Sequence, residues 1–453
     1  MILKSINPFT NEVIEEFEEI SGEMAEKVLT ESGEAFEKWK RTGIEYRGSL
    51  MEKAAALLRS NMNEYAGSIT LEMGKPLKES RAEVDKCALV CEYYAKNAKR
   101  FLSPEPAETD ADISYVTFEP LGTILGIMPW NFPFWQVFRF AVPTLMAGNT
   151  VLLKHASNVQ ICARNIENLF TRAGFPPSVF RNLVIGSGRM DKIIKHDCIR
   201  AVSLTGSESA GQKVAEAAGS VLKKCLLELG GSNAFVVLED ANIRKAVEIG
   251  IKARFQNAGQ SCIAAKRFIL DRKISDEFLD LFLDGIRKLK TGNPAEEDTD
   301  IGPLASIWQA VKVEEQVVRS VAMGARVIAG GIRNKTFYQP AVVVDVTPGM
   351  PLFDEEVFGP VAPVSISDNT AEAITIANKT NFGLGVSLFT DDLDKAYDLA
   401  REFHDGAVFI NGMVKSDPRL PFGGTRHSGF GRELAIQGIR EFVNIKTVWA
   451  KKL

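Results

Sequence analysis

Apolar residues near the start of the chain recur at intervals of three and four positions. The stretches MAEKVLTESGEAFEKWK at 24–40 and RGSLMEKAAALLRSNMNEYAGSITLEMG at 47–74 show this spacing most clearly. Such spacing places the apolar side chains on one face of a helix. We therefore expect residues 1–100 to form a helical opening.

After this opening the pattern changes to short strands that alternate with helices. ISYVTFEP at 113–120 and LGTILGIMP at 121–129 are β-rich and interrupted by Pro or Gly. TVLLKHA at 150–156 predicts a buried strand, NVQICARNIENLFTRAG at 158–174 a helix, and AVSLTGS at 201–207 a further strand. Strand, helix and strand at this spacing predict a parallel sheet with crossover helices.

The same alternation begins again after the paired glycines at 230–231. NAFVVLED at 233–240 predicts a strand, NIRKAVEIGIKARFQNAG at 242–259 a helix, and KRFILD at 266–271 a strand. Later strands are predicted at RVIAGG (326–331), PVSISD (363–368), VSLFTD (386–391) and GAVFING (406–412), with a helix at TAEAITIANKT (370–380). We expect two α/β units with a boundary near residue 229.

The composition of the chain argues against some classes of binding partner. The chain has 453 residues, enough for two or three domains, and its net charge of -4 offers no basic surface for nucleic acid. The start, MILKSINPFTNEVIEEF, lacks a basic segment followed by an apolar one, and no apolar run is long enough to cross a bilayer. We expect a cytoplasmic protein with a small-molecule partner and no membrane partner.

The six cysteines are scattered along the chain without a C-x-x-C pair. Free thiols are therefore favoured over disulfides, and no metal site is expected. Cys262 follows a glycine turn in QNAGQSCIAAKRFIL at 256–270 and precedes a predicted strand. By itself it could be a reactive thiol or a small buried apolar side chain.

Three other motifs are ambiguous when each is taken alone. Asn131 in IMPWNFPFWQ could cap the helix that follows, which is the simpler interpretation. Glu228 in LLELGGSN lies between leucines, where burial would raise its pKa as a general base requires, although it could also be a solvated residue at a strand end. DEEVFGPV at 354–361 places an acidic pair before a Gly-Pro turn.

Together these motifs resemble the aldehyde dehydrogenase superfamily over nearly the whole chain. They follow the order and approximate spacing of that family, and the segments at 152–158 and 428–449 further resemble its bacterial succinate semialdehyde dehydrogenase branch. The motifs are PWNFP (129–133), LTGS (204–207), ELGG (228–231), GQSC (259–262), EEVFGP (355–360), NFGLG (381–385) and PFGG (421–424).

The resemblance implies an α/β fold with two parallel-sheet domains and a small β arm for oligomerisation. The Rossmann-like NAD(P)-binding domain is expected at 1–100 and 120–229, and the catalytic domain at 230–430. The oligomerisation arm is expected at 101–119 and 431–453, which implies a homodimer or homotetramer.

The resemblance also implies NAD(P)-dependent oxidation of an aldehyde to a carboxylic acid. Cys262 is expected to add to the aldehyde carbon to form a thiohemiacetal, which becomes a thioester after hydride loss. Asn131 and the backbone N–H of Cys262 are expected to stabilise the developing oxyanion. Glu228 is expected to activate the water that hydrolyses the thioester.

The cofactor residues follow from the same resemblance. Ser157 occupies a position where many family members carry Glu, and a serine would not repel a 2′-phosphate, so NADP is expected beside NAD. IGSGRM at 185–190 is only a partial glycine fingerprint and does not support a conventional phosphate loop. The implied contacts are Lys154 and Trp130 along the adenosine ribose, Gly206 and Ser207 at the pyrophosphate, and Glu356 with Phe358 at the nicotinamide ribose.

Arg139 is the residue that bears on the substrate. The succinate semialdehyde dehydrogenase branch carries arginine at this position, which implies a contact with the distal carboxylate of succinic semialdehyde, helped by Ser416 or Lys415. The alternative is an ion pair between Arg139 and a carboxylate of the protein itself. Gln256 stands where the branch has a second arginine, so anion binding would depend on Arg139 and the loop before PFGG.

Three other functions remain open. The chain could oxidise another semialdehyde or a neutral aliphatic aldehyde. It could be an acylating dehydrogenase that passes the thioester to phosphate or coenzyme A, but the presence of Glu228 argues against that. A non-catalytic binding protein is disfavoured because Cys262, Asn131 and Glu228 are all present.

Overall fold

The N-terminal segment is a β-hairpin and not a helix. In this computed structural model, which describes residues 2–452, β1 (Ile2–Ile6) pairs antiparallel with β2 (Val13–Glu18). The expectation of a fully helical opening is wrong here, because alternation over only five residues of β1 is a weak signal beside the longer helical pattern that follows. The helices that follow are α1 (Gly22–Trp39), α2 (Ile44–Ser60), α3 (Met62–Met73) and α4 (Leu77–Phe101).

The first α/β unit contains a six-stranded sheet in the order β19-β9-β8-β5-β6-β7. Strands β5 to β9 are parallel, and β19 runs antiparallel to β9. Apolar side chains of α1, α7 and α8 cover one face of this sheet, and those of α2 to α6 cover the other. The remaining elements are β5 (Thr123–Met128), α5 (Trp135–Met146), β6 (Thr150–His155), α6 (Gln160–Ala173), β7 (Phe180–Asn182), α7 (Met190–Lys195), β8 (Ile199–Thr205), α8 (Glu208–Gly219), β9 (Lys224–Glu228) and β19 (Gly429–Phe430).

The second unit contains a seven-stranded sheet in the order β12-β15-β16-β11-β10-β17-β18. Only β12 is antiparallel to its neighbour. Helices α9 to α12 contribute to the core on one face, and α13 and α14 cover the other. The elements are β10 (Ala234–Val237), α9 (Ile243–Phe255), β11 (Arg267–Asp271), α10 (Ser275–Ile286), α11 (Ile307–Ala322), β12 (Arg326–Ala329), β13 (Arg333–Asn334), β14 (Phe337–Tyr338), β15 (Ala341–Val344), α12 (Pro351–Asp354), β16 (Val361–Ser367), α13 (Thr370–Asn378), β17 (Val386–Phe389), α14 (Leu393–Leu399) and β18 (Val408–Ile410).

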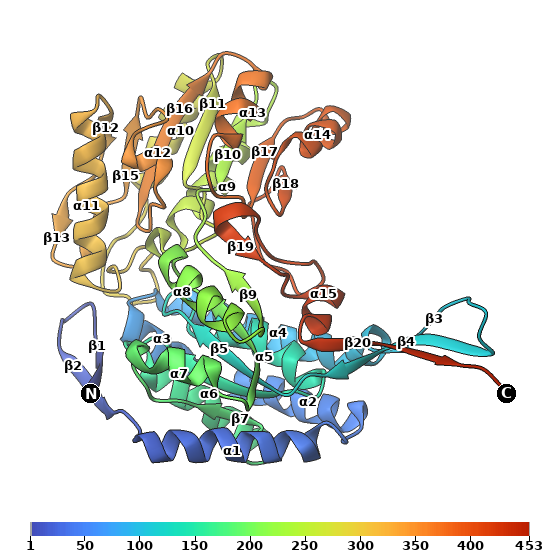
Figure 1. Cartoon of the computed structure of the whole chain (residues 1–453). Helices are drawn as coiled ribbons and strands as arrows, with labels where there is room; N and C mark the ends of the chain where they lie inside the picture. The colour runs from blue at the N-terminus through green and yellow to red at the C-terminus, as the bar shows by residue number, and fades with distance from the viewer. Residues whose placement is uncertain (1, 453) are drawn as a thin grey trace.

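A β arm projects from the side of the molecule (Figure 1). It is a three-stranded sheet in which β4 (Ile113–Pro120) lies between β3 (Glu105–Pro106) and β20 (Val443–Ala450). The chain reaches β20 through the short helix α15 (Ala435–Arg440). The arm carries exposed apolar side chains, namely Ile113, Ile445 and Trp449.

The chain passes from the first sheet to the second between β9 and β10. Gly230 and Gly231 make this passage, and neither has room for a larger residue. A Cβ atom at Gly230 would lie 2.5 Å from Oε2 of Glu356, and one at Gly231 would lie 2.9 Å from the carbonyl oxygen of Cys262. The crossing therefore brings residues of both units together in front of the carboxyl ends of the first sheet's parallel strands.

Candidate active site

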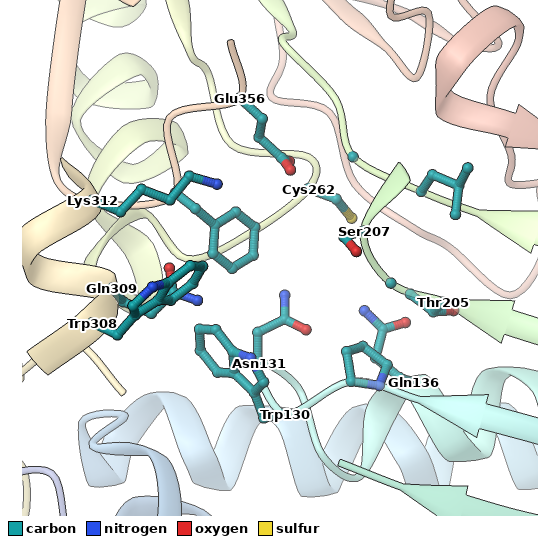
Figure 2. A pocket seen from close by; sticks show the side chains of 15 residues that line it. Trp130, Asn131, Gln136, Thr205, Ser207, Cys262, Trp308, Gln309, Lys312 and Glu356 are labelled. Carbon is teal, nitrogen blue, oxygen red and sulfur yellow. The ribbon is translucent and has the colours of Figure 1, made fainter. Parts of the chain in front are cut away.

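Cys262 lies between two cavities and borders both of them. Gln136, which the sequence analysis did not single out, is the other side chain that borders both. We call the first the Trp130 cavity; its walls include Trp130, Asn131, Gly206, Ser207, Glu356 and Phe358 (Figure 2). We call the second, of about 250 Å³, the Lys86 cavity; its walls include Lys86, Trp135, Arg139, Lys415, Ser416 and Phe422.

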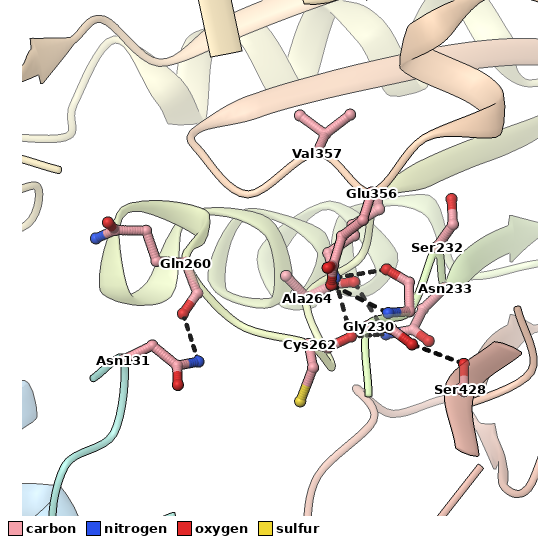
Figure 3. Close-up of polar contacts among 12 residues, drawn as sticks. Asn131, Gly230, Ser232, Asn233, Gln260, Cys262, Ala264, Glu356, Val357 and Ser428 are labelled. Carbon is pink, nitrogen blue, oxygen red and sulfur yellow. Dashed lines mark hydrogen bonds and ion pairs between the residues drawn. The ribbon is translucent and has the colours of Figure 1, made fainter. Parts of the chain in front are cut away.

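Asn131 is bound to the loop that carries Cys262. Its Nδ2 donates to the carbonyl oxygen of Gln260 at 3.1 Å (Figure 3), and Nδ2 of Asn257 donates back to the Asn131 carbonyl at 2.9 Å. Helix α5 begins after Phe134 and has no side-chain cap, so the capping interpretation of Asn131 is wrong. The structure thus holds the Asn131 amide against the Cys262 loop, and both residues border the Trp130 cavity. Its role as a donor to an oxyanion stays a prediction.

The loop before Cys262 is in a strained backbone conformation. Asn257 has φ of 55°, Ala258 of 50° and Gly259 of 73°. Left-handed residues other than glycine are uncommon and cost free energy. The side chain of Asn257 offsets that free-energy cost with two hydrogen bonds. One goes to the Asn131 carbonyl, and the other goes to the Gln260 carbonyl at 3.1 Å. This arrangement directs the Cys262 side chain away from the hydrogen-bonded cluster around Glu356 (Figure 3).

The Cys262 thiol is protonated in this environment. Burial raises its pKa to about 11, and the positive charges of Arg139 and Lys266 oppose that rise only in part. The Lys266 ammonium lies 3.0 Å from the Cys262 carbonyl oxygen and also forms an ion pair with Glu356 at 2.6 Å. A reaction at the sulfur must therefore begin with removal of its proton.

Glu228 is buried at the end of β9 and borders neither cavity. Neither carboxyl oxygen has a hydrogen-bond partner among residues 2–452, and burial raises the pKa well above the usual range of glutamate. The carboxyl lies under Gly423, where a Cβ atom would come within 2.8 Å of Oε1. A high pKa makes the Glu228 carboxylate a strong base once the buried carboxyl has lost its proton, and its predicted role requires the side chain to move toward Cys262.

The Trp130 cavity gathers five of the predicted cofactor residues. Glu356 accepts a hydrogen bond from the Gly231 N–H at 3.0 Å, and Phe358 meets Trp130 edge to face with ring centroids 5.7 Å apart. Ser207 caps α8 through a 3.4 Å bond from the Ala210 N–H. The start of a helix beside a glycine offers backbone N–H groups to a phosphate, so this donor set suits a dinucleotide.

Lys154 and Ser157 lie outside the walls of the Trp130 cavity. Lys154 is the next-to-last residue of β6, in a buried position that lowers its pKa, and it forms no ion pair within residues 2–452. Ser157 is exposed in the turn that precedes α6. Ser157 follows Lys154 by three residues, and a lysine that forms no ion pair is suited to an anionic ribose phosphate.

His155, next to Lys154, has a structural role. Its ring is fully buried and neutral, because burial lowers its pKa to about 4. Nε2 donates to the Pro133 carbonyl at 2.8 Å, and Nδ1 accepts from the Ala156 N–H at 2.9 Å. The histidine therefore ties the end of β6 to the turn that carries Asn131, a role that the sequence analysis did not anticipate.

The Lys86 cavity contains the predicted substrate residues. Arg139 forms a buried ion pair with Glu433 and donates to Thr205 Oγ1 at 3.3 Å. This is the alternative that the sequence left open, and a contact between Arg139 and substrate stays a prediction. Ser416 is buried in the cavity wall and Lys415 is exposed at it.

Comparisons with known proteins show the family of the chain. The model of the Aldehyde dehydrogenase family matches residues 2–448. The chain belongs to the aldehyde dehydrogenase family. A probable succinate-semialdehyde dehydrogenase [NADP(+)] of Synechocystis is 47% identical over 99% of this chain and 100% of that protein. A succinate semialdehyde dehydrogenase [NAD(P)+] of Escherichia coli is 42% identical over 99% of this chain and 98% of that one.

Solved structures confirm the predicted fold class of this aldehyde dehydrogenase. Succinic semialdehyde dehydrogenase from Streptococcus pyogenes, in complex with NADP+, superposes with a TM-score of 0.97. It is 35% identical, and the match covers 99% of this chain and 100% of that one. Within residues 2–452, no helix has the length and apolar character needed to traverse a bilayer.

Proposed function

We propose that this aldehyde dehydrogenase oxidises succinic semialdehyde to succinate with NADP or NAD. The observation that carries the proposal is the position of Cys262 between two cavities of different chemistry. The Trp130 cavity offers Glu356 and the start of α8 to a dinucleotide, and the Lys86 cavity offers cations to an acid. The names of the relatives add support for the same substrate and cofactor.

The first step is assigned to Cys262. The Cys262 thiol loses its proton to solvent water, and its sulfur then adds to the aldehyde carbon as the carbonyl double bond breaks and the oxygen becomes an anion. The Asn131 amide and the Cys262 backbone N–H stabilise that charge, which is greater in the transition state than in the bound aldehyde. When bound, the nicotinamide cofactor supplies a hydride acceptor, and the bond from Cys262 to carbon then becomes a thioester.

The second step is assigned to Glu228. Its carboxylate takes a proton from water, the resulting hydroxide attacks the thioester carbon, and the carbon–sulfur bond breaks to release the acid and the Cys262 thiolate. The buried position of Glu228 keeps its pKa high, which suits a base that must accept a proton near neutral pH. This step distinguishes hydrolysis from acyl transfer to phosphate or coenzyme A.

The predicted cofactor residues are assigned to three parts of the dinucleotide. Gly206 and Ser207 receive the pyrophosphate, Glu356 and Phe358 hold the nicotinamide ribose, and Trp130 with Lys154 and Ser157 lies toward the adenosine. The first unit, 1–100 and 120–229, accordingly serves as the cofactor domain and 230–430 as the catalytic domain. Lys154, which forms no ion pair within residues 2–452, supports acceptance of a 2′-phosphate.

We further propose that the segments at 101–119 and 431–453 pair with another copy of the chain to form a homodimer or homotetramer. The exposed apolar residues Ile113, Ile445 and Trp449 on the projecting β arm support this assignment. Light scattering of the purified protein would give its mass in solution. The cytoplasmic location stays a prediction from the sequence.

The proposed function is tested by a panel of aldehydes with both cofactors. We expect kcat/KM for succinic semialdehyde to exceed that for butyraldehyde, which has the same carbon number and no carboxylate, and we expect turnover with NADP. Equal kcat/KM for the two aldehydes would refute the assignment of succinic semialdehyde as the substrate and would leave an aldehyde dehydrogenase with another substrate. No turnover of any aldehyde, with or without phosphate or coenzyme A, would leave only the binding-protein alternative.

A further inference from the structure

Lys86 is a cation of the Lys86 cavity that the family motifs do not include. It lies on α4, one turn beyond Ala82 and Glu83, and all three side chains border the cavity that reaches Cys262. Within residues 2–452 it forms no ion pair with a carboxylate. A partly buried ammonium without a counter-ion is unusual, because burial of a charge is costly unless it is paired.

The charged neighbours of Lys86 are already occupied by other partners. Glu83 forms a buried ion pair with Lys75 and accepts the Phe134 N–H at 2.9 Å. Arg139 is neutralised by Glu433. Asp417 in turn pairs with Arg419. Lys86 therefore has no ion-pair partner of its own within residues 2–452, and Glu83 and Asp417 act on its charge only at longer range, whereas Arg139 is paired directly with Glu433.

The Lys86 ammonium is held in place by neutral groups. It lies 4.1 Å from the centroid of the Trp135 ring and donates to Ser416 Oγ at 2.8 Å. Trp135 Nε1 also donates to the same oxygen, at 3.0 Å. With two N–H groups directed at Ser416 Oγ, its own hydroxyl proton is free to donate elsewhere, and the ammonium keeps further N–H groups.

We propose that Lys86, together with the Ser416 hydroxyl, binds the distal carboxylate of the aldehyde substrate and selects acidic aldehydes over neutral ones. The inference rests on the proposed function and deepens it. The site has the chemistry that a carboxylate needs: an unpaired ammonium, a hydroxyl donor beside it, and a cavity that joins both to the Cys262 sulfur. Arg139 then serves to hold Glu433 and shape the cavity wall.

The test compares Lys86→Met with Lys86→Arg. Methionine keeps most of the apolar stem and removes the charge, and arginine keeps the charge. We expect Lys86→Met to lower kcat/KM for succinic semialdehyde about tenfold to a hundredfold, mainly through KM, because a hydrogen bond to a charged group is lost. For butyraldehyde the change should stay below about threefold. Lys86→Arg should recover most of the loss in kcat/KM. The inhibition constant of succinate should rise in Lys86→Met and return toward the wild-type value in Lys86→Arg.

Lys96 provides a matched control, because it lies on the same helix, is exposed and borders neither cavity. Lys96→Met should change kcat/KM for succinic semialdehyde by less than about twofold. An equal fall for both aldehydes in Lys86→Met, without recovery in Lys86→Arg, would make Lys86 structural and overturn the inference. If the wild-type enzyme prefers succinic semialdehyde and Lys86→Met keeps that preference, the inference alone fails. If the wild-type enzyme shows no such preference, the proposed function fails.

Discussion

The Trp130 cavity and the Lys86 cavity meet at Cys262 but are built differently. The Trp130 cavity is formed largely by strand ends and glycine turns, such as Gly206 after β8 and Gly230 after β9, so its shape depends on the backbone. The Lys86 cavity is formed by side chains of α4 and α5 and of the loop that contains Ser416. Substitutions on the second side can therefore change substrate preference while the cofactor side keeps its geometry.

The sulfur of Cys262 is the group that both cavities share, so its removal gives the largest effect. We expect Cys262→Ala to lower aldehyde oxidation on the order of a millionfold, to background, for every substrate. Cofactor affinity should stay within a few-fold, because the thiol bonds to the substrate. Absorbance of the reduced nicotinamide measures the first quantity, and calorimetric titration with NADP measures the second. Retained turnover would refute the proposed mechanism.

Glu228 acts after the cofactor has been reduced, so its replacement should separate the two half-reactions. Glu228→Gln is expected to release one reduced nicotinamide per site in a burst and then to slow by about a hundredfold to ten-thousandfold. Stopped-flow absorbance would resolve both phases. A steady-state rate equal to the wild type, with no burst, would show that another group activates the water.

Replacement of Arg139 tests whether its charge stabilises the fold or binds the substrate. Arg139→Leu leaves Glu433 buried without its partner, so we expect a loss of about 3 to 5 kcal/mol in the free energy of unfolding. Replacing both members, as in Arg139→Leu with Glu433→Leu, should recover much of that loss. Urea denaturation measures it. An unchanged stability, with activity lost only for succinic semialdehyde, would assign the carboxylate contact to Arg139.

Replacement of Ser157 tests its proposed position beside the 2′-phosphate of NADP. A carboxylate at this exposed turn would repel a 2′-phosphate, so Ser157→Glu should raise KM for NADP about tenfold more than KM for NAD. Ser157→Gln, which has similar size and no charge, is the control. If Ser157→Glu raises both KM values equally, the residue does not lie beside the 2′ position.

The smallest expected effect is a pH dependence of substrate preference. Burial lowers the pKa of Lys86 to about 8, so its charge is present below that pH and is lost above it. The ratio of kcat/KM for succinic semialdehyde to that for butyraldehyde should fall about fivefold between about pH 7 and pH 9, and taking the ratio cancels the titration of Cys262.

Other ionisable groups near Lys86 must be considered in that experiment. Glu79 borders the same cavity, and burial raises its pKa to about 7, so its ionisation would lower the ratio at the start of the range. Lys86→Arg should remove the part of the fall above about pH 8, because arginine stays charged. A fall that persists in Lys86→Arg would assign the dependence to another group. The groups that face Lys86 are Glu79, Glu83, Arg139, Lys415 and Asp417.

Local signals in the sequence were sufficient for most elements of the fold. Helix α6 ends where predicted, because Gly174 adopts the left-handed conformation that closes a helix. The two runs of alternating strands and helices correspond to the two parallel sheets. The β1–β2 hairpin was missed because its alternating pattern is very short, and the role of His155 was missed because both of its carbonyl neighbours come from other elements.

The sequence by itself determined the family and the α/β class, and it predicted Cys262, Asn131 and Glu228 as the chemical residues, because each of them lies in a contiguous motif. Only the tertiary structure decided the partners of side chains that face into cavities. Arg139 pairs with Glu433, and Lys86 meets Ser416, at positions far along the chain. Periodicity can place a lysine on a helix face, but whether its charge is neutralised depends on which distant groups the packing brings within a few ångströms.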